Sequence, residues 1–125
     1  MKSRLMYVEL KTGYNDNGPA WIGKASFSKT GRTVYFNGQA FRGGRIGGNH
    51  HEVESGNIYW ISGVKKDGSD RHWAGSGGIK IDKAVIAEYL AIVNQNKLPK
   101  NKFEIVELDN NPPKEMVNEV ANQKI

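Results

Sequence analysis

Apolar and polar residues alternate most clearly over residues 21–40, on both sides of the dipeptide Thr30-Gly31. A period of two residues predicts a β-hairpin whose turn is at that dipeptide. In this register one face is mostly polar and carries Tyr35 beside Lys24 and Asn37, so Tyr35 is expected to be exposed. The other face is the predicted core face, which holds Trp21, Ala25, Phe27, Val34, Phe36 and Ala40.

Two glycines, Gly23 and Gly38, come opposite each other in the same register. Because neither has a Cβ, they leave a gap in the ribbon. Such a gap predicts a sharp bend, or a second element that lies close to the backbone. A bent ribbon of this kind favours a small barrel.

Two further β-segments flank this ribbon. Residues 4–11 alternate as a first strand whose inward residues are predicted to be Met6, Val8 and Leu10. Residues 57–81 predict a second hairpin that turns at Asp67-Gly68. Both faces of that hairpin are partly apolar, so the pattern leaves open which face is buried. A shift of one residue would exchange the faces.

The C-terminal third has a different composition. Asp82 is a predicted N-cap for a helix over residues 83–93, which carries an apolar stripe for packing on the sheet. A polar linker over residues 94–102 precedes a predicted edge strand at 102–108, and a short helix is expected after Asn111-Pro112-Pro113.

These elements predict a mainly β protein. The expected fold is a five-stranded antiparallel barrel or strongly bent sheet of the SH3-like or OB-like kind, with one packed α-helix. The predicted organisation is a barrel module with its closing helix over residues 1–95, followed by a C-terminal extension over residues 96–125.

Composition narrows the class of protein. The 125 residues include no cysteine, which excludes disulfides and cysteine-based zinc sites. No run of about 18 apolar residues is present, and the start lacks the apolar block of a signal peptide, so we expect a cytoplasmic protein without a membrane span. Of the net charge of +5, all is contributed by residues 1–82, which contain twelve Lys and Arg against seven Asp and Glu.

Basic and aromatic residues together favour nucleic-acid binding. Small barrels stack unpaired bases on exposed aromatic side chains and follow the backbone with Lys and Arg. The glycine-rich loop over residues 42–51 and the Lys65-Lys66 tip are the expected binding elements. For Trp60 and Trp73 we favour a core position over an exposed one. The predicted contact residues are Tyr14, Lys24, Tyr35, Arg42, Arg45, Lys65, Lys66 and Arg71.

The sequence predicts no metal and no cofactor. Adjacent histidines in a strand point to opposite sides, and no familiar zinc spacing is present. If a metal is bound, His50, His51 and His72 with Glu52 or Glu54 are the ligands to test. The chain has two glycine clusters, at residues 43–48 and 75–78. Neither has the features of a phosphate-binding Walker loop.

No group of residues in the sequence identifies a particular reaction. The groups available for acid–base chemistry are His72, Asp70, Glu52 and Glu54, and nothing in their spacing requires them to converge. A noncatalytic protein is therefore favoured. A small enzyme or ligand carrier that uses His72 and the loop carboxylates stays open.

The run at residues 9–23, together with residues 59–63 and 65–68, resembles short bacterial β-rich proteins of unknown function. The resemblance covers about residues 5–94. It implies a self-contained β-module followed by a helix, and it brings no activity and no catalytic residues. The leading hypothesis is a module that binds single-stranded nucleic acid. The alternative is a protein- or peptide-interaction module that uses an aromatic groove or a sheet edge.

Overall fold

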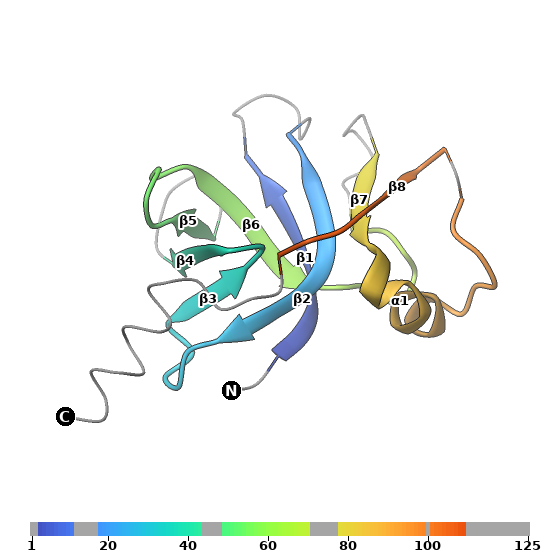
Figure 1. The fold of residues 1–125 in the computed structure, drawn as a ribbon, viewed down its shortest axis with the longest axis horizontal. Helices are drawn as coiled ribbons and strands as arrows, with labels where there is room; N and C mark the ends of the chain where they lie inside the picture. The colour runs from blue at the N-terminus through green and yellow to red at the C-terminus, as the bar shows by residue number, and fades with distance from the viewer. Residues whose placement is uncertain (1–2, 12–17, 44–48, 71–77, 100, 110–125) are drawn as a thin grey trace.

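The computed structural model describes residues 3–11, 18–43, 49–70, 78–99 and 101–109. Within these ranges the chain forms a mainly β structure with one short helix (Figure 1). The elements in chain order are β1 (Ser3–Leu10), β2 (Ala20–Phe27), β3 (Thr33–Phe36), β4 (Gln39–Gly43), β5 (His50–Glu52), β6 (Ile58–Gly63), β7 (Ile79–Asp82), η1 (Lys83–Val85), α1 (Ile86–Val93) and β8 (Phe103–Val106).

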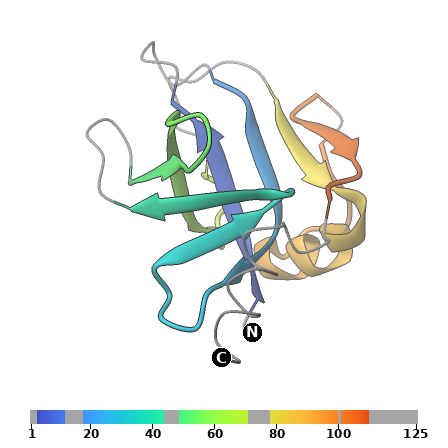
Figure 2. The same ribbon diagram turned by 60° about the vertical axis from the view of Figure 1, so that its left-hand side comes forward.

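Six strands form a closed antiparallel barrel (Figure 2). Their order is β1-β6-β5-β4-β3-β2, and pairing of β2 with β1 closes the ring. The prediction of a mainly β fold with a small barrel and one packed helix is confirmed. The expected strand count was five. The observed barrel has six, because the predicted second strand of the first hairpin divides into β3 and β4, β5 forms at the end of the segment predicted to be a loop, and β7 lies outside the barrel.

The first predicted hairpin is correct around its turn. Ser26 pairs with Tyr35 across the loop that contains Thr30-Gly31, in the predicted register. The prediction that this ribbon continues to Ala40 is wrong. The dipeptide Asn37-Gly38, with φ of 50° and 76°, forms a tight turn between β3 and β4, so Ala40 pairs with Tyr35. An Asn-Gly pair suits such a turn because both residues tolerate positive φ.

The second predicted hairpin is wrong, although its turn exists. The Gly68 N–H donates to the Lys65 carbonyl at 3.1 Å. However, β6 pairs with β1 and β5, and β7 runs parallel to β2 and β8. Both edges of β6 are thus occupied within the barrel, and the apolar side chains of β7 are buried against the outside of the barrel instead.

The helix and the edge strand are confirmed. Asp82 caps the helical segment, because its side chain accepts a hydrogen bond from the Ala84 N–H at 3.1 Å. The first turn is the 3-10 turn η1, and α1 continues to Val93. Asn94, with a φ of 56°, is the C-cap that ends the helix. β8 pairs parallel with β7. The short helix predicted after Pro113 lies outside the described residues. No helix in the described ranges is both long and apolar enough to span a bilayer.

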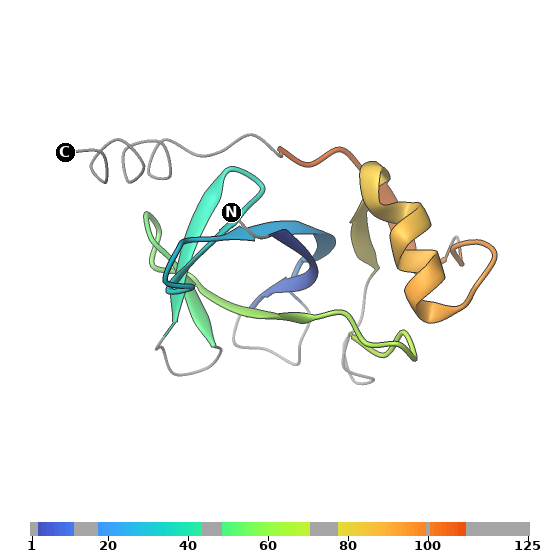
Figure 3. The same ribbon diagram turned by 90° about the horizontal axis from the view of Figure 1, so that it is seen from below.

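Apolar side chains gather in two separate cores. The barrel core fills the interior, and the second core lies between the outer faces of β1 and β2 and a unit that we call the annex, made of β7, η1, α1 and β8 (Figure 3). Buried residues of the barrel core are Met6, Val8, Ala25, Val34, Phe36, Phe41, Tyr59 and Ile61. Buried residues of the annex core are Leu5, Tyr7, Ala20, Ile22, Ile79, Ile81, Val85 and Tyr89.

A segment after β8 lies close to the barrel wall at both predicted glycines. A Cβ added at Gly23 would lie 2.7 Å from Leu108 Cδ1, and one at Gly38 would lie 2.9 Å from a carboxylate oxygen of Asp109. The Asp109 N–H donates to Asn37 Oδ1 at 2.8 Å. The predicted close approach of a second element is therefore confirmed. The two glycines are not opposite each other, because Gly38 belongs to the β3–β4 turn.

Candidate functional site

Strand pairing places four residues in one row across the outside of the barrel. Thr33 of β3 pairs with Arg42 of β4, Arg42 pairs with His51 of β5, and His51 pairs with Ile58 of β6. Residues that are opposite in a ladder point to the same side of the sheet, and their sequence neighbours point to the other side. Since Phe41 belongs to the barrel core, this row lies on the outside. We call this side of β3–β6 the outer barrel face.

Trp60 is an exposed aromatic residue on this face. It follows Ile58 by two residues, which gives it the same orientation, and 42% of its surface is exposed. The expectation that Trp60 is a core residue is wrong, because Tyr59 and Ile61 take the inward positions of β6. Trp21 packs on the barrel core, with the Lys80 ammonium 5.8 Å from its ring centroid. Trp73 lies outside the described residues.

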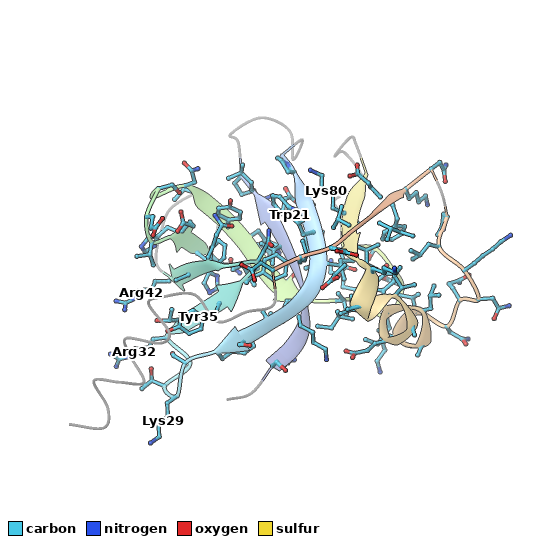
Figure 4. The ribbon with its side chains drawn as sticks, viewed as in Figure 1. Trp21, Lys29, Arg32, Tyr35, Arg42 and Lys80 are labelled. Atoms are coloured by element: carbon cyan, nitrogen blue, oxygen red, sulfur yellow. The ribbon has the colours of Figure 1, made fainter. Side chains whose placement is uncertain are left out.

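Three exposed cations gather at one end of the outer barrel face. Arg42 projects from β4, and Lys29 and Arg32 project from the β2–β3 loop beside it (Figure 4). None of the three forms an ion pair with another described residue. Sequence reasoning identified Arg42 and missed the other two. The available signal was their position on either side of the predicted Thr30-Gly31 turn, which had to be exposed.

Two carboxylates near this face are held by other groups. Glu9, which pairs across the ladder with Trp60, is buried and accepts hydrogen bonds from the Tyr7 hydroxyl and from Lys11 Nζ. Glu52 points to the inner side and accepts the backbone N–H groups of the next turn at 2.9 Å. Burial raises the pKa of Glu52, but these N–H donors outweigh burial and the net pKa is lowered. Glu54 is exposed at the rim of the face.

The histidines of β5 lie on opposite sides of the strand, as predicted. His51 is in the outer row, and its buried Nδ1 has no hydrogen-bond partner among the described residues. His50 Nδ1 lies 2.8 Å from Asn49 Oδ1, and its pKa is lowered by burial and by the neighbouring His51. No group of three His, Asp or Glu side chains is arranged to hold a metal ion in the described part of the chain. His72 of the predicted ligand set lies outside it.

Two predicted contact residues are engaged in packing or pairing. Lys24 Nζ lies 2.9 Å from Glu88 Oε1, so this cation joins β2 to α1. Tyr35 points to the outside as predicted, but only 5% of its surface is exposed because it packs with Ala40 in a small cluster of its own. The expectation that Tyr35 is exposed is therefore wrong.

Lys65 and Lys66 of the predicted contact set do not lie beside Arg42. Lys65 and Lys66 are exposed in the turn after β6, which lies beside α1, at the other end of the molecule from β4 (Figures 1 and 3). Asp70 anchors this turn by accepting the Lys65 N–H at 2.7 Å. The turn lies close to the helix, because a Cβ added at Gly68 would be 3.8 Å from the Tyr89 hydroxyl of α1. Burial and the Asp70 charge raise the pKa of Tyr89 to about 12. Tyr14, Arg45 and Arg71 lie outside the described residues.

Comparison with family models, with curated proteins and with solved structures finds no match to this chain. The fold itself defines the class. The chain is a mainly β protein whose closed antiparallel barrel is extended by two parallel strands and one short helix. Its outer barrel face combines an exposed tryptophan with exposed cations.

Proposed function

We propose that this protein is a noncatalytic module that binds single-stranded nucleic acid across the outer barrel face. The observation that carries the proposal is the placement of exposed Trp60 on the same side of the barrel as Arg42. A base would stack on the indole ring, and phosphates would contact Arg42, Arg32 and Lys29. A single strand is favoured because stacking on a side chain requires a base that is free of its partner strand.

The geometry indicates how the nucleic acid would run. β4 and β6 are separated by β5, so Arg42 and Trp60 are about 10 Å apart in the direction across the strands. The bound strand would therefore cross β6, β5 and β4 toward the β2–β3 loop. His51 lies between the two residues in this direction and can donate or accept a hydrogen bond to a base or sugar.

The test is fluorescence anisotropy of the full chain with labelled mixed-sequence oligonucleotides and with the matching duplex. We expect Trp60→Ala to weaken binding of the single strand by about 5- to 100-fold, the effect of losing one stacked base. Arg42→Ala should reduce the slope of log affinity against log salt by about 1. Quenching of Trp60 fluorescence on binding gives a direct readout of stacking.

The matched control is Lys97→Ala, which removes an exposed cation from the segment after α1 and keeps the outer barrel face intact. It should leave both affinity and salt slope unchanged. Binding that is insensitive to salt, or a loss in Lys97→Ala equal to that in Arg42→Ala, would contradict the proposal. So would the absence of any binding at low salt.

A further inference from the structure

β8 is the last strand of the eight-stranded sheet, and within the described chain it pairs with β7 alone. The Ile79 N–H donates to the Lys102 carbonyl, and the register sets Ile79 opposite Phe103. In a parallel ladder with this register, alternate residues of β8 direct their backbone groups toward β7. The N–H and carbonyl groups of Phe103 and Ile105 therefore point to the outer edge, where another strand can bond to them.

The same edge exposes a large apolar side chain. Ile105 is 58% exposed, more than the other large hydrophobic residues exposed in the described ranges, Val53 at 43% and Trp60 at 42%. Proteins protect an edge strand by keeping it short, by charged side chains, by a proline or a bulge, or by a covering element. β8 is short and carries Glu104, but it has neither a proline nor a bulge, and the ladder to β7 is continuous.

The charge of the residues along β8 indicates which kind of strand could bind to its outer edge. Glu104 in β8 and Glu107 directly after it are exposed. Neither Glu104 nor Glu107 forms an ion pair with any residue that the structure describes. This acidic edge contrasts with the cationic end of the outer barrel face, and it favours a basic partner.

On its inner edge, β8 already pairs with one lysine and one aliphatic residue of β7. β7 places Lys80 opposite Glu104 and Ile81 opposite Ile105. A lysine beside the carboxylate and an aliphatic residue beside the isoleucine are both favourable cross-strand pairs. The outer edge offers the same two side chains to a second strand.

We propose that the outer edge of β8 binds a basic extended peptide by strand addition. The peptide backbone bonds to the outward groups of Phe103 and Ile105, an aliphatic side chain packs beside Ile105, and the adjacent Lys or Arg lies beside Glu104. This binding site is separate from the outer barrel face and does not rest on the proposed nucleic-acid binding.

The experiment measures anisotropy of a fluorescein-labelled acetyl-Lys-Val-Lys-Val-Lys-Val-Lys-amide peptide with the full chain. Saturable binding is expected, and Ile105→Pro should weaken it at least tenfold because proline removes the outward N–H. The N–H of this residue does not bond to β7, so the thermal midpoint should be retained. Ile105→Lys, which leaves the backbone intact, should also weaken binding. Glu104→Gln should weaken it by about two- to fivefold.

The matched control peptide replaces each lysine with glutamate and should not bind. Equal affinity of wild type and both Ile105 variants for the lysine peptide would overturn the proposal, as would binding of the glutamate peptide. Sedimentation that shows a dimer sensitive to Ile105→Lys, without peptide binding, would assign the edge to a second copy of the chain and also overturn it. Oligonucleotide affinity should be the same in wild type and Ile105→Pro, which separates this test from that of the proposed function.

Discussion

The barrel and the annex bury similar numbers of apolar side chains but are built in different ways. In the barrel, β2 to β6 pair in chain order through antiparallel ladders. In the annex, β7 joins β2 and β8 joins β7 through parallel ladders, which require long connections. β1 and β2 contribute to both cores, since Met6 and Val8 point inward while Leu5 and Tyr7 point toward the annex.

This difference indicates whether the barrel or the annex depends on the other for its stability. The annex core uses the outer faces of β1 and β2, so it exists only where the barrel has formed. Among the described residues after β6, in contrast, Leu108 alone packs on the barrel core. We therefore infer that the barrel is the more stable unit and that the annex opens before it.

The largest effect is expected from a cavity in the barrel core. Phe41 is fully buried and packs edge-on against Tyr59 with ring centroids 4.8 Å apart. Phe41→Ala should lower the free energy of unfolding by about 3–5 kcal/mol. Ile81→Ala, at a fully buried position of the annex, should cost about 2–4 kcal/mol. Denaturant unfolding measures both values.

Hydrogen exchange then separates the two units. In Ile81→Ala, amides of β7, α1 and β8 should lose protection while those of β3 and β4 keep it. In Phe41→Ala the loss should extend to every element. A uniform loss in both variants would show that barrel and annex form one cooperative unit, contrary to the inference.

The next test is the contact between Gly23 of the barrel and Leu108, which follows β8 of the annex. Gly23→Ala places a methyl group 2.7 Å from Leu108 Cδ1 and 3.1 Å from the Phe36 ring, and should cost about 1–3 kcal/mol by overpacking. Leu108→Ala should cost about 1–2 kcal/mol. Because Leu108→Ala makes room for the added methyl group, the double variant should cost less than the sum. Strict additivity in denaturant unfolding would contradict the contact.

The contributions of two buried carboxylates to stability should change with pH in opposite directions. Burial raises the pKa of Asp70 beside the annex, so its contribution to stability falls as pH rises from about 3.9 through the raised pKa. Asp70→Asn keeps an acceptor for the Lys65 N–H and should be more stable than wild type at pH 7, with no difference near pH 3.

Glu52 in the barrel is the opposite case. Its net pKa is lowered, so its stabilising contribution is present above about pH 4.3 and is lost as pH falls through the lowered value. Glu52→Gln should cost about 1–2 kcal/mol at pH 7 and little at pH 2. Thermal unfolding from pH 2 to pH 8 measures both variants, and shifts of the same sign would refute the assignment.

The smallest effect is expected at the surface pair between barrel and annex. The side chains of Lys24 and Glu88 are 38% and 45% exposed. Lys24→Ala should therefore change the free energy of unfolding by less than about 0.5 kcal/mol. A loss above 1 kcal/mol in low-salt unfolding would show that this pair holds α1 on the barrel.

Part of the candidate site was predictable and part was not. Arg42 follows a clear apolar strand, and its basic character marked it directly. A core position was favoured for Trp60 because tryptophan in a small domain is more often buried than exposed. The pattern left open which face of its segment is buried, and only pairing with β1 and β5 decides it. Tyr35 had the predicted orientation, but its burial depends on packing with Ala40. The sequence prediction placed Ala40 elsewhere, because it missed the turn at Asn37-Gly38 that pairs Ala40 with Tyr35.

The sequence by itself determined the local structure. Alternation placed β1 and β2, the register around Thr30-Gly31 was correct, and Asp82 marked the start of the helical segment. Only the tertiary structure decided that β7 leaves β6 to run parallel to β2, and that both faces of β1 are buried. The physical reason is that a period of two residues specifies a strand and its faces, whereas the choice of partner depends on which distant apolar surface the strand can cover.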